Sequence, residues 1–469
     1  MSNALPSPAT VPLRKDVPVV TTVDVLVIGG GPAGIGAALG AARSGAKTAL
    51  VERYGFLGGA ATAMAVGPFM TSFSLDTDQQ IIGGVFDELV RRMAKRQGAI
   101  HPKHVRDGSP ESGFYIYGHD HVTPFDGEAL KLEAADMMLE AGVTLFLHSD
   151  FLEPIMDGKR IAGGIVHNKS GFQAIGAQTV IDCTGDGDVA FRAGVPTAQG
   201  SSADGLTQPV TMFFRVGNVD DAAVEAHVAA HPEQKGKLFR PLLDAARERG
   251  EFSIPTNRIG VYRSVQKGVW RVNTARLQGV DATNAAELTK AEVEGRRQVW
   301  ELMAFFRKHL PGFENAVLLD SAPQIGVRET RRIVGEYVLS AEDLTAGRHF
   351  DDVIALASFA IDIHPAKGLG GGVESALNAG YKAAPVYEIP YRSLVPTVVD
   401  NLLVSGRCLS ATHEALGAVR VMPPCFAMGQ AAGVAAALAV ATGVPPRKVD
   451  VRRLQEMLVQ QGAILQRPV

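Results

Sequence analysis

The sequence predicts an α/β fold: a Rossmann-like domain with an inserted β-meander, carrying a second, mixed α+β domain. Three observations lead to this prediction. Residues 23–52 follow the order strand, glycine turn, helix, strand, which is typical of a dinucleotide-binding βαβ unit. Two further glycine turns follow apolar, β-rich stretches, near residues 185 and 406. Between them, from about residue 210, long helical patterns replace the short strands.

Length and composition allow two or three domain-sized units with a large core. The chain has 469 residues, of which 46% are hydrophobic and 20% charged. We expect a loosely ordered arm at residues 1–18, a discontinuous nucleotide-binding domain at 19–216 and 396–469, and a cap or substrate domain at 217–395. The net charge of −3 offers no basic footprint for nucleic acid.

The first βαβ unit contains a complete dinucleotide-binding fingerprint. Residues 29–34, GGGPAG, fit G-x-G-x-x-G directly after an apolar run, and Glu52 ends the next strand about 20 residues on. Gly29 permits the tight turn, Gly31 lets the backbone approach a pyrophosphate, and Gly34 lets helix and strand pack closely. The helix N-terminus attracts phosphate, and Glu52 can accept hydrogen bonds from ribose hydroxyls.

The next hundred residues alternate helices, loops and short strands. We expect helices at 79–97 and 125–141, the second capped by Asp126, a strand at 143–148, and three short strands with turns at 157–158 and 169–171. The irregular segment 98–122 holds four histidines, whose spacing fits no known metal motif, so we expect no metal. They are His101, His104, His119 and His121.

A second glycine turn follows the strand that begins at Gln178. The segment Thr184 to Asp188 is acidic and glycine-rich, and it can bring backbone and a carboxylate to the ribose or pyrophosphate. The alternative is a calcium loop, because Asp186 and Asp188 have D-x-D spacing. The glutamate that closes an EF-hand is missing, which argues against calcium.

The predicted cap domain is mainly helical. A strand at 211–216 precedes helical stretches at 220–249 and 284–310. In the longer helix we expect these apolar residues to face inward: Leu288, Val293, Val299, Leu302, Met303 and Phe306. Arg328 and Arg331 would share a face if their segment is helical. They would then bind an anionic substrate, or else pair with Glu329 and Glu336.

The C-terminal third offers two candidate histidines and a third glycine turn. His364 ends a predicted strand at 358–364, just before the glycine run 368–372. A strand then leads into Gly406-Arg407, and the loop that follows holds His413 and Arg420. A small-residue helix starts near Pro424, and its positive N-terminus would suit an anionic heterocycle.

Cysteines and terminal segments point to an intracellular protein. Cys183, Cys408 and Cys425 form no C-x-x-C pair, so we expect buried, inert thiols rather than a cluster or a disulfide scaffold. The N-terminus lacks the apolar core of a signal peptide, and no uninterrupted apolar stretch of about 18 residues indicates a membrane span. We therefore expect a cytoplasmic location.

Four motifs together resemble the FAD-dependent oxidoreductases with a glutathione-reductase-type or fumarate-reductase-type flavin domain. They are Leu57 to Thr62 (LGGAAT), Val180 to Asp188, Gly326 to Arg332 (GVRETRR) and Arg420 to Gly433. The resemblance runs from about Val23 to Ala441 and is closest to an uncharacterised bacterial branch of these enzymes. The motifs are specific for the flavin fold, but not for a substrate.

The resemblance implies FAD as cofactor and assigns residues to it. The expected cofactor-binding residues are Gly29, Gly31, Ala33 and Gly34 at the pyrophosphate, Glu52 at the ribose, Arg53 along the adenosine, Phe151 at adenine, Thr184, Gly185 and Asp186 near the pyrophosphate, Gly406 and Arg407 at the ribityl chain, Val421 and Met422 at the pyrimidine edge, and Gly59, Ala60, Ala61 and Thr62 at the flavin ring.

The expected reaction is hydride transfer from a small polar metabolite to flavin N5. His364 is the first candidate for the base and His413 the second, while Arg328, Arg331 and Arg420 are candidates to hold an anion. No second fingerprint suggests an NAD(P)H domain, so the electron acceptor is oxygen, a quinone or a partner protein. Two alternatives stay open: an NAD(P)H-dependent flavin monooxygenase, and a non-turnover FAD-binding subunit of an electron-transfer assembly. The apolar, helix-rich cap makes a homodimer plausible.

Overall fold

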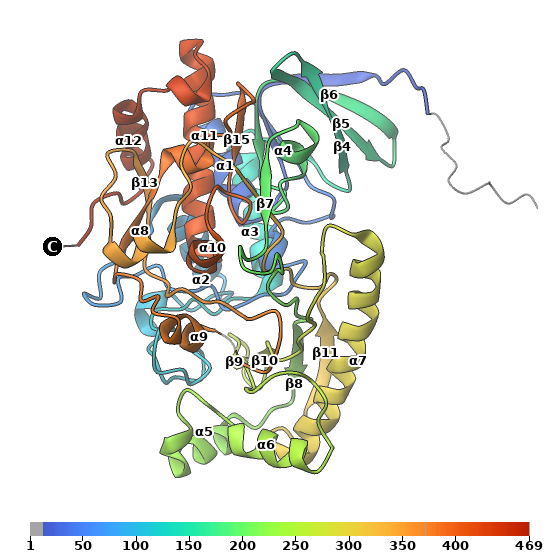
Figure 1. Ribbon diagram of the computed structural model, residues 1–469, viewed down its shortest axis with the longest axis vertical. Coiled ribbons are helices and arrows are strands. Elements are labelled where there is room, and N and C mark those ends of the chain that lie inside the picture. The colour runs from blue at the N-terminus through green and yellow to red at the C-terminus, as the bar shows by residue number, and fades with distance from the viewer. Residues whose placement is uncertain (1–12, 371, 469) are drawn as a thin grey trace, which may run out of the picture.

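The computed structural model describes residues 13–370 and 372–468 of a mixed α/β fold. Most of the predicted N-terminal arm, residues 1–12, lies outside the described residues. Figure 1 shows a larger upper part, which holds the main sheet and a long C-terminal helix, and a smaller lower part with its own strands and helices. Residues 13–18 are largely exposed and lead into the first strand.

The main sheet has seven strands in the order β3-β2-β1-β6-β5-β4, with β15 also paired to β6. The first four strands of this order and β15 are parallel, whereas β4 and β5 continue the sheet as an antiparallel meander. The strands are β1 (Val19–Ile28), β2 (Thr48–Val51), β3 (Thr144–Phe146), β4 (Asp150–Asp157), β5 (Arg160–Asn168), β6 (Gly171–Asp182) and β15 (Leu402–Val404).

The parallel strands end level with one another. Ile28 at the end of β1 pairs with Val51 of β2 and with Asp182 of β6. Asp182 in turn pairs with Val404 at the end of β15. The three predicted glycine turns therefore leave the sheet at the same edge, although they are far apart in the sequence. This is the edge at which open α/β sheets bind their ligands.

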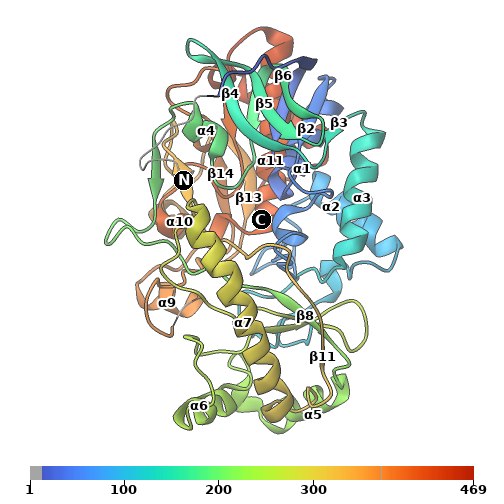
Figure 2. The ribbon, with the colours of Figure 1, turned by 90° about the vertical axis from the view of Figure 1, so that its right-hand side faces the viewer.

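Strand β6 differs from the prediction of two separate strands. It runs unbroken from Gly171 to Asp182; its first half pairs with β5 and its second half runs between β1 and β15. Gly176 occupies the middle of this strand, where the periodicity of side chains is weak. The meander is therefore an extension of the parallel sheet, as the green strands at the top of Figure 2 show.

The longer helices of the upper part pack on the main sheet or on the long C-terminal helix. They are α1 (Pro32–Arg43), α2 (Gly84–Lys95), α3 (Gly127–Glu140), α11 (Met422–Thr442) and α12 (Val451–Gln460). Helix α2 begins five residues later than predicted, α3 is capped by Asp126 as predicted, and α12 was not predicted. By length and composition α11 could cross a membrane, but 78% of its most apolar window is buried inside the protein, as in a core helix.

Helices α1 and α11 touch backbone to backbone. A methyl group at Gly36 would strike the carbonyl of Phe426, and one at Gly433 would strike the carbonyl of Ala37. Gly40 and Gly429 make equally close approaches to the facing helix. These four glycines let the two helices cross at close range and seat the start of α11 beside the first glycine turn.

The lower part surrounds a four-stranded antiparallel sheet in the order β11-β8-β10-β9. Its strands are β8 (Phe214–Gly217), β9 (Val261–Arg263), β10 (Trp270–Val272) and β11 (Val317–Ser321), and its helices are α5 (Asp221–Ala230), α6 (Arg240–Glu248) and α7 (Ala285–His309). Of the residues predicted to face inward from α7, Val293 is half exposed, so that assignment is wrong. Helix α7 runs down the right-hand side in Figure 1 and faces the viewer in Figure 2.

The hydrophobic cores divide the chain differently from the predicted domains. One core joins α1 and α11 to residues 339–395, which include β13 (Val353–Ala357) and β14 (Tyr387–Pro390). A second core is built from residues 210–327 and Phe114. The domain limits remain a prediction, but residues 339–395 pack with the upper part of the molecule.

The remaining elements are β7 (Thr197–Gln199), β12 (Arg331–Ile333), α4 (Asp188–Arg192), α8 (Ala341–Ala346), α9 (Val373–Asn378) and α10 (His413–Val419).

The close crossing of α1 and α11 predicts a steric effect on stability. Replacing Gly433 by Ala should destabilise the fold by about 1–3 kcal/mol, because the methyl group has no room beside Ala37. Gly127→Ala is the matched control, since nothing lies within 4 Å of a methyl group at that position. Thermal unfolding followed by circular dichroism should show a lower midpoint for Gly433→Ala alone. Equal midpoints for the two variants would contradict this packing.

Candidate functional site

A cavity of about 680 Å³ lies at the carboxyl edge of the main sheet and reaches into the lower part. Fifteen of the eighteen predicted cofactor-binding residues line it. They are Gly29, Gly31, Ala33, Glu52, Arg53, Gly59, Ala60, Phe151, Thr184, Gly185, Asp186, Gly406, Arg407, Val421 and Met422. Gly34, Ala61 and Thr62 do not line it; the Thr62 hydroxyl donates to the carbonyl of Leu57 at 2.8 Å instead of facing a ring.

The glycines of the first turn serve two different purposes. A methyl group at Gly29 would strike the carbonyl of Cys183, and one at Gly34 would strike the carbonyl of Gly29, so both are required by packing. Gly31 has an extended backbone (φ −75°), and a methyl group there would meet only Cα of Gly59, at 3.7 Å. Nothing in the chain itself requires glycine at position 31. The open space beside it is what the close approach of a bound dinucleotide needs.

Glu52 lines the cavity, and two backbone hydrogen bonds fix the orientation of its carboxylate. The backbone N–H of Gly30 donates to Oε2 at 2.7 Å, and the N–H of Tyr54 donates to Oε1 at 2.9 Å. Burial raises the pKa of Glu52, while these two hydrogen bonds lower it. Each carboxylate oxygen keeps a further lone pair for a ribose hydroxyl.

The second and third turns are joined by a charged contact. Arg407 donates through Nη2 to Asp186 at 2.8 Å, and the hydroxyl of Thr330 donates to the same carboxylate at 2.7 Å. Arg331, predicted to hold a substrate anion, instead donates to the Asp186 carbonyl and to Asp188, both at 2.9 Å. Arg331 does not line the cavity. It holds the acidic turn, and its role toward a substrate anion stays a prediction that these contacts do not support.

The shared face predicted for Arg328 and Arg331 is also absent. The segment before Arg331 is irregular, and Arg331–Ile333 forms β12, which pairs with β7. Arg328 contacts Pro209 and Asn273, whereas Arg331 contacts the acidic turn at 186–188, so the two guanidinium groups bind different segments.

The N-terminus of α11 reaches the cavity through Val421 and Met422. The helix begins at Met422, two residues before the predicted start. Pro423 and Pro424 have no N–H, so Met422 carries the amide donor of the first three helical positions. The positive end of the helix dipole lies here as well.

An imidazole–carboxylate pair lines the cavity beside this helix. His364 Nε2 lies 3.4 Å from Asp362 Oδ1. The backbone N–H of His364 donates to the side-chain oxygen of Gln208. Burial lowers the pKa of His364 to about 3, so the imidazole is neutral near pH 7. The pKa of Asp362 is held below its usual range by His364 and Arg420, despite burial. The predicted strand 358–364 is displaced, because β13 ends at Ala357.

Four arginines surround this pair; Asp362 acts on all of them, while Glu374 also acts on Arg258 and Glu329 on Arg420. Arg258, Arg328 and Arg420 line the cavity, and Arg276 lies close enough to lower the pKa of Arg328. Burial lowers the pKa of Arg328 to about 9 and that of Arg276 to about 10. Asp362 offsets one of these four positive charges, which leaves a surplus that favours an anion.

Arg328 and Arg420 already have partners in the protein. Arg328 Nη1 donates to the carbonyl of Pro209 at 2.7 Å, and its Nη2 donates to Asn273 at 3.3 Å. Arg420 Nη2 donates to the side chain of Gln208 and to the carbonyl of Asp362, both at 3.2 Å. Within the described residues, Arg420 Nε and the Ser405 hydroxyl are buried without a partner, and both residues line the cavity. These orphaned groups and the space beside Gly31 suit a polar ligand with the extent of FAD.

His413, the second candidate base, lies outside the cavity lining. It begins α10 after the N-cap Thr412, and its Nδ1 lies 2.9 Å from the carboxylate of Glu329. Glu329 is fully buried and also pairs with Arg332. His413 therefore belongs to the buried polar network around Glu329, and its role as a base stays a prediction that this position does not support.

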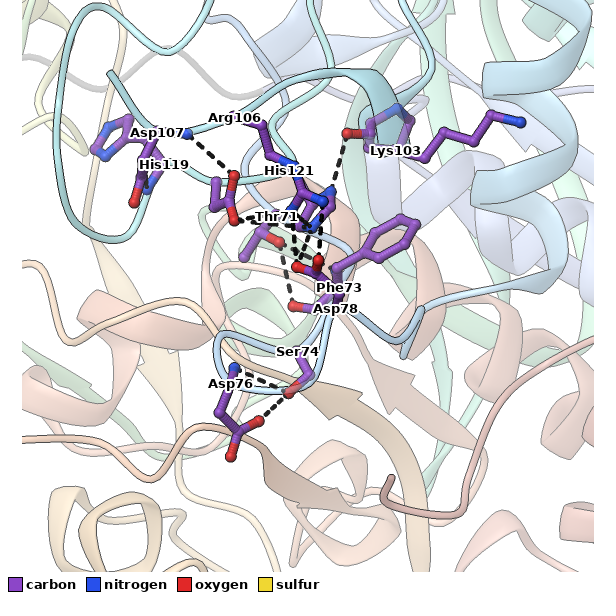
Figure 3. A network of polar contacts seen from close by, with 12 residues as sticks. Thr71, Phe73, Ser74, Asp76, Asp78, Lys103, Arg106, Asp107, His119 and His121 are labelled. Atoms are coloured by element: carbon purple, nitrogen blue, oxygen red, sulfur yellow. Dashed lines mark hydrogen bonds and ion pairs between the residues drawn. The ribbon is translucent and has the colours of Figure 1, made fainter. Parts of the chain in front are cut away.

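The histidine-rich loop forms a separate polar network (Figure 3). Asp78, Asp120 and His121 place one ligand atom each within 4.8 Å of one another, which is a possible metal-binding geometry. Arg106, however, contacts Asp78 Oδ1 at 2.7 Å and Asp120 Oδ2 at 3.3 Å. Its guanidinium already neutralises the carboxylates that a metal ion would need. His101 and His104 stack edge to face in the same loop.

Several cavity residues escaped the sequence analysis. Asp362 lies two positions before His364, so both side chains point to the same side of an extended segment. That spacing could have predicted the contact between the carboxylate and the imidazole. Arg258, Tyr115 and Tyr262 come from loops and a short strand with no recognisable motif. The three thiols are buried and unpaired, and burial raises their pKa, to about 12 for Cys425.

Comparison with known proteins identifies one family. The family model described as FAD dependent oxidoreductase matches residues 24–458. No curated protein matches the chain. Among solved structures, the chain is similar to a geranylgeranyl bacteriochlorophyll reductase-like protein from Thermoplasma acidophilum, with 13% identity, a TM-score of 0.45, and coverage of 95% of this chain and 84% of that one.

Two further solved structures have the same degree of similarity. The p-nitrophenol 4-monooxygenase PnpA from Pseudomonas putida DLL-E4 has 12% identity and a TM-score of 0.47, covering 94% of this chain and 85% of that one. The flavin-dependent brominase Bmp2 has 12% identity and a TM-score of 0.45, covering 94% and 83%.

The buried network around Glu329 predicts a large loss of stability on neutralisation. Glu329→Gln removes the charge that offsets Arg332 and should cost about 3–5 kcal/mol, because an unpaired charge stays buried. Glu336→Gln is the control, since Glu336 only approaches Arg447 at 3.8 Å and is part exposed. The thermal midpoint should fall sharply for Glu329→Gln alone. A midpoint equal to that of wild type would show that the network contributes little.

Proposed function

The chain belongs to the FAD-dependent oxidoreductase family, and on this premise we propose that it oxidises a small, anionic metabolite beside FAD held in the cavity. The observation that best supports this proposal is the cavity itself. It joins the three glycine turns at one end to the His364–Asp362 pair and the surplus of arginine at the other. We infer a flavin domain of the glutathione-reductase or fumarate-reductase type from the motifs and from the level strand ends.

The proposed FAD contacts follow the lining of the cavity. Glu52 would bind the adenosine ribose, and the open backbone at Gly31 would admit the pyrophosphate, with Asp186 and Arg407 alongside. Met422, at the positive end of α11, would meet the pyrimidine edge. When bound, the flavin supplies the acceptor for two electrons.

Within this proposal, His364 receives the proton that the substrate loses. Its neutral imidazole is able to accept a proton, and the Asp362 carboxylate at 3.4 Å stabilises the resulting cation. An anionic substrate offsets part of the arginine charge and thereby raises the low pKa of His364 toward a useful value. Arg328 and Arg420 contribute the field that attracts that anion.

The remaining expectations concern partners and location. We propose oxygen, a quinone or a partner protein as electron acceptor, and we keep the cytoplasmic location and the homodimer as proposals from the sequence. The proposed reaction needs no NAD(P)H. Mixing FAD-loaded protein with NADPH alone should leave the flavin oxidised, whereas rapid stoichiometric bleaching would favour the monooxygenase alternative.

Gly31→Ala tests the proposed pyrophosphate site without disturbing the fold. The methyl group has room in the protein alone but projects into the space proposed for the pyrophosphate, so FAD affinity should fall about tenfold or more. The thermal midpoint of the FAD-free protein should not change. Gly127→Ala, at the half-buried start of α3 where a methyl group has open space, should alter neither property. Undiminished FAD binding by Gly31→Ala would argue against this placement of the cofactor.

His364→Gln tests the proposed base. Losing a positioned proton acceptor should slow flavin reduction about 100-fold or more, with a substrate found by screening organic acids for bleaching of the flavin band. His309→Gln is the control, because His309 pairs with Glu251 at the end of α7 and does not line the cavity. FAD content should be equal in both variants. A wild-type rate in His364→Gln would remove this residue from the reaction.

A further inference from the structure

Arg258 differs from the other cavity arginines because its guanidinium has no hydrogen-bond or ion-pair partner in the part of the chain that the structure describes. Among residues 13–370 and 372–468, no side chain or carbonyl forms a hydrogen bond or ion pair with its guanidinium, although Arg328 and Arg420 each have several. The group lies over the ring of Tyr115, with 5.4 Å between its carbon and the ring centre. A guanidinium stacked on a ring in this way keeps its N–H edge available for a carboxylate.

The wall beside Arg258 is aromatic and uncharged. Tyr115 stacks on His119 with ring centres 4.3 Å apart, and Tyr262 lies 6.1 Å from each of them. Burial lowers the pKa of His119 to about 4 and raises the pKa of Tyr262, so both side chains are neutral near pH 7. All three line the cavity. Such a wall suits a flat or apolar body better than a small, strongly hydrated one.

The rim of the cavity continues this apolar character toward solvent. Ile116 is 61% exposed, Tyr117 44% and Leu377 42%, and all three also belong to the cavity lining. Exposed apolar side chains gathered at the opening of a pocket indicate a ligand that is itself partly apolar. Lys235 and Lys237 also line the cavity, and Lys237 lies 4.0 Å from the carboxylate of Glu374, which offsets its charge.

We propose that the substrate is an organic acid with an aromatic or bulky apolar body, whose carboxylate binds the guanidinium edge of Arg258 and whose body lies against Tyr115, His119 and Tyr262. This inference rests on the proposed function and names its substrate class. Arg328 and Arg420 supply the field around this acid, while Arg258 contacts it. The apolar rim at Ile116 and Tyr117 admits its body.

Calorimetric titration of the FAD-loaded protein with three probes tests the proposal. Phenylacetate should bind at least about tenfold more tightly than acetate, which lacks the body, and than phenylacetamide, which lacks the charge. Arg258→Gln should weaken phenylacetate binding by about tenfold or more and leave phenylacetamide within about twofold. Arg258→Lys, which keeps the charge but loses the planar fork, should fall between.

Further variants test the contribution of the substrate's apolar body separately from that of its carboxylate. Tyr117→Ser should weaken phenylacetate binding but not acetate binding. Trp300→Ser is the control and should change neither, because Trp300 is an exposed apolar residue on α7 outside the cavity lining. Equal binding of acetate and phenylacetate, or full phenylacetate affinity in Arg258→Gln, would overturn the substrate class. Wild-type protein that retains FAD while failing these tests keeps the proposed function. Protein that takes up no FAD refutes the proposed function, and this inference with it.

Discussion

The pairing of Ile28, Asp182 and Val404 in adjacent parallel strands is the constraint on which the site depends. Hydrogen bonding between strands fixes these three residues side by side, so the chain must leave the sheet at one edge in all three places. Gly29, Thr184 and Gly406 then face the same space although up to 377 residues separate them. The contact between Arg407 and Asp186 adds a direct link from the third turn to the second.

The other end of the cavity is organised by charge rather than by backbone pairing. Four arginines from separate segments share the field of the Asp362 carboxylate there, and burial strengthens their fields while removing the water that would screen them. Three of them, Arg276, Arg328 and Arg420, donate to protein oxygens, whereas Arg258 lies over a tyrosine ring without such a partner in the described chain. The glycine contacts between α1 and α11 connect the two ends, because they seat Met422 next to the first turn.

Local patterns in the sequence predicted the parts of the fold that are set locally. The first βαβ unit, the cap of α3 and the three turns have short-range signals: apolar runs, Asp126, and glycines followed by small residues. The joining of the meander to β6 could not be read from residues 171–182, because Gly176 weakens the side-chain pattern and the pairing with β15 spans more than 200 residues. The sequence predicts His413 as a base and Arg331 as an anion-binding residue because it does not show that Glu329 and Asp186 contact them in the folded chain. Arg258 carried no motif at all; only the folded chain brings it over Tyr115.

The central claim is that three separated turns grip a single FAD, and a crystal structure of the protein grown with FAD tests it most directly. The account predicts one FAD per chain, with its ribose at Glu52, its pyrophosphate beside Gly31 and its flavin ring near Met422. FAD bound elsewhere on the protein, or crystals without FAD despite saturating cofactor, would contradict it.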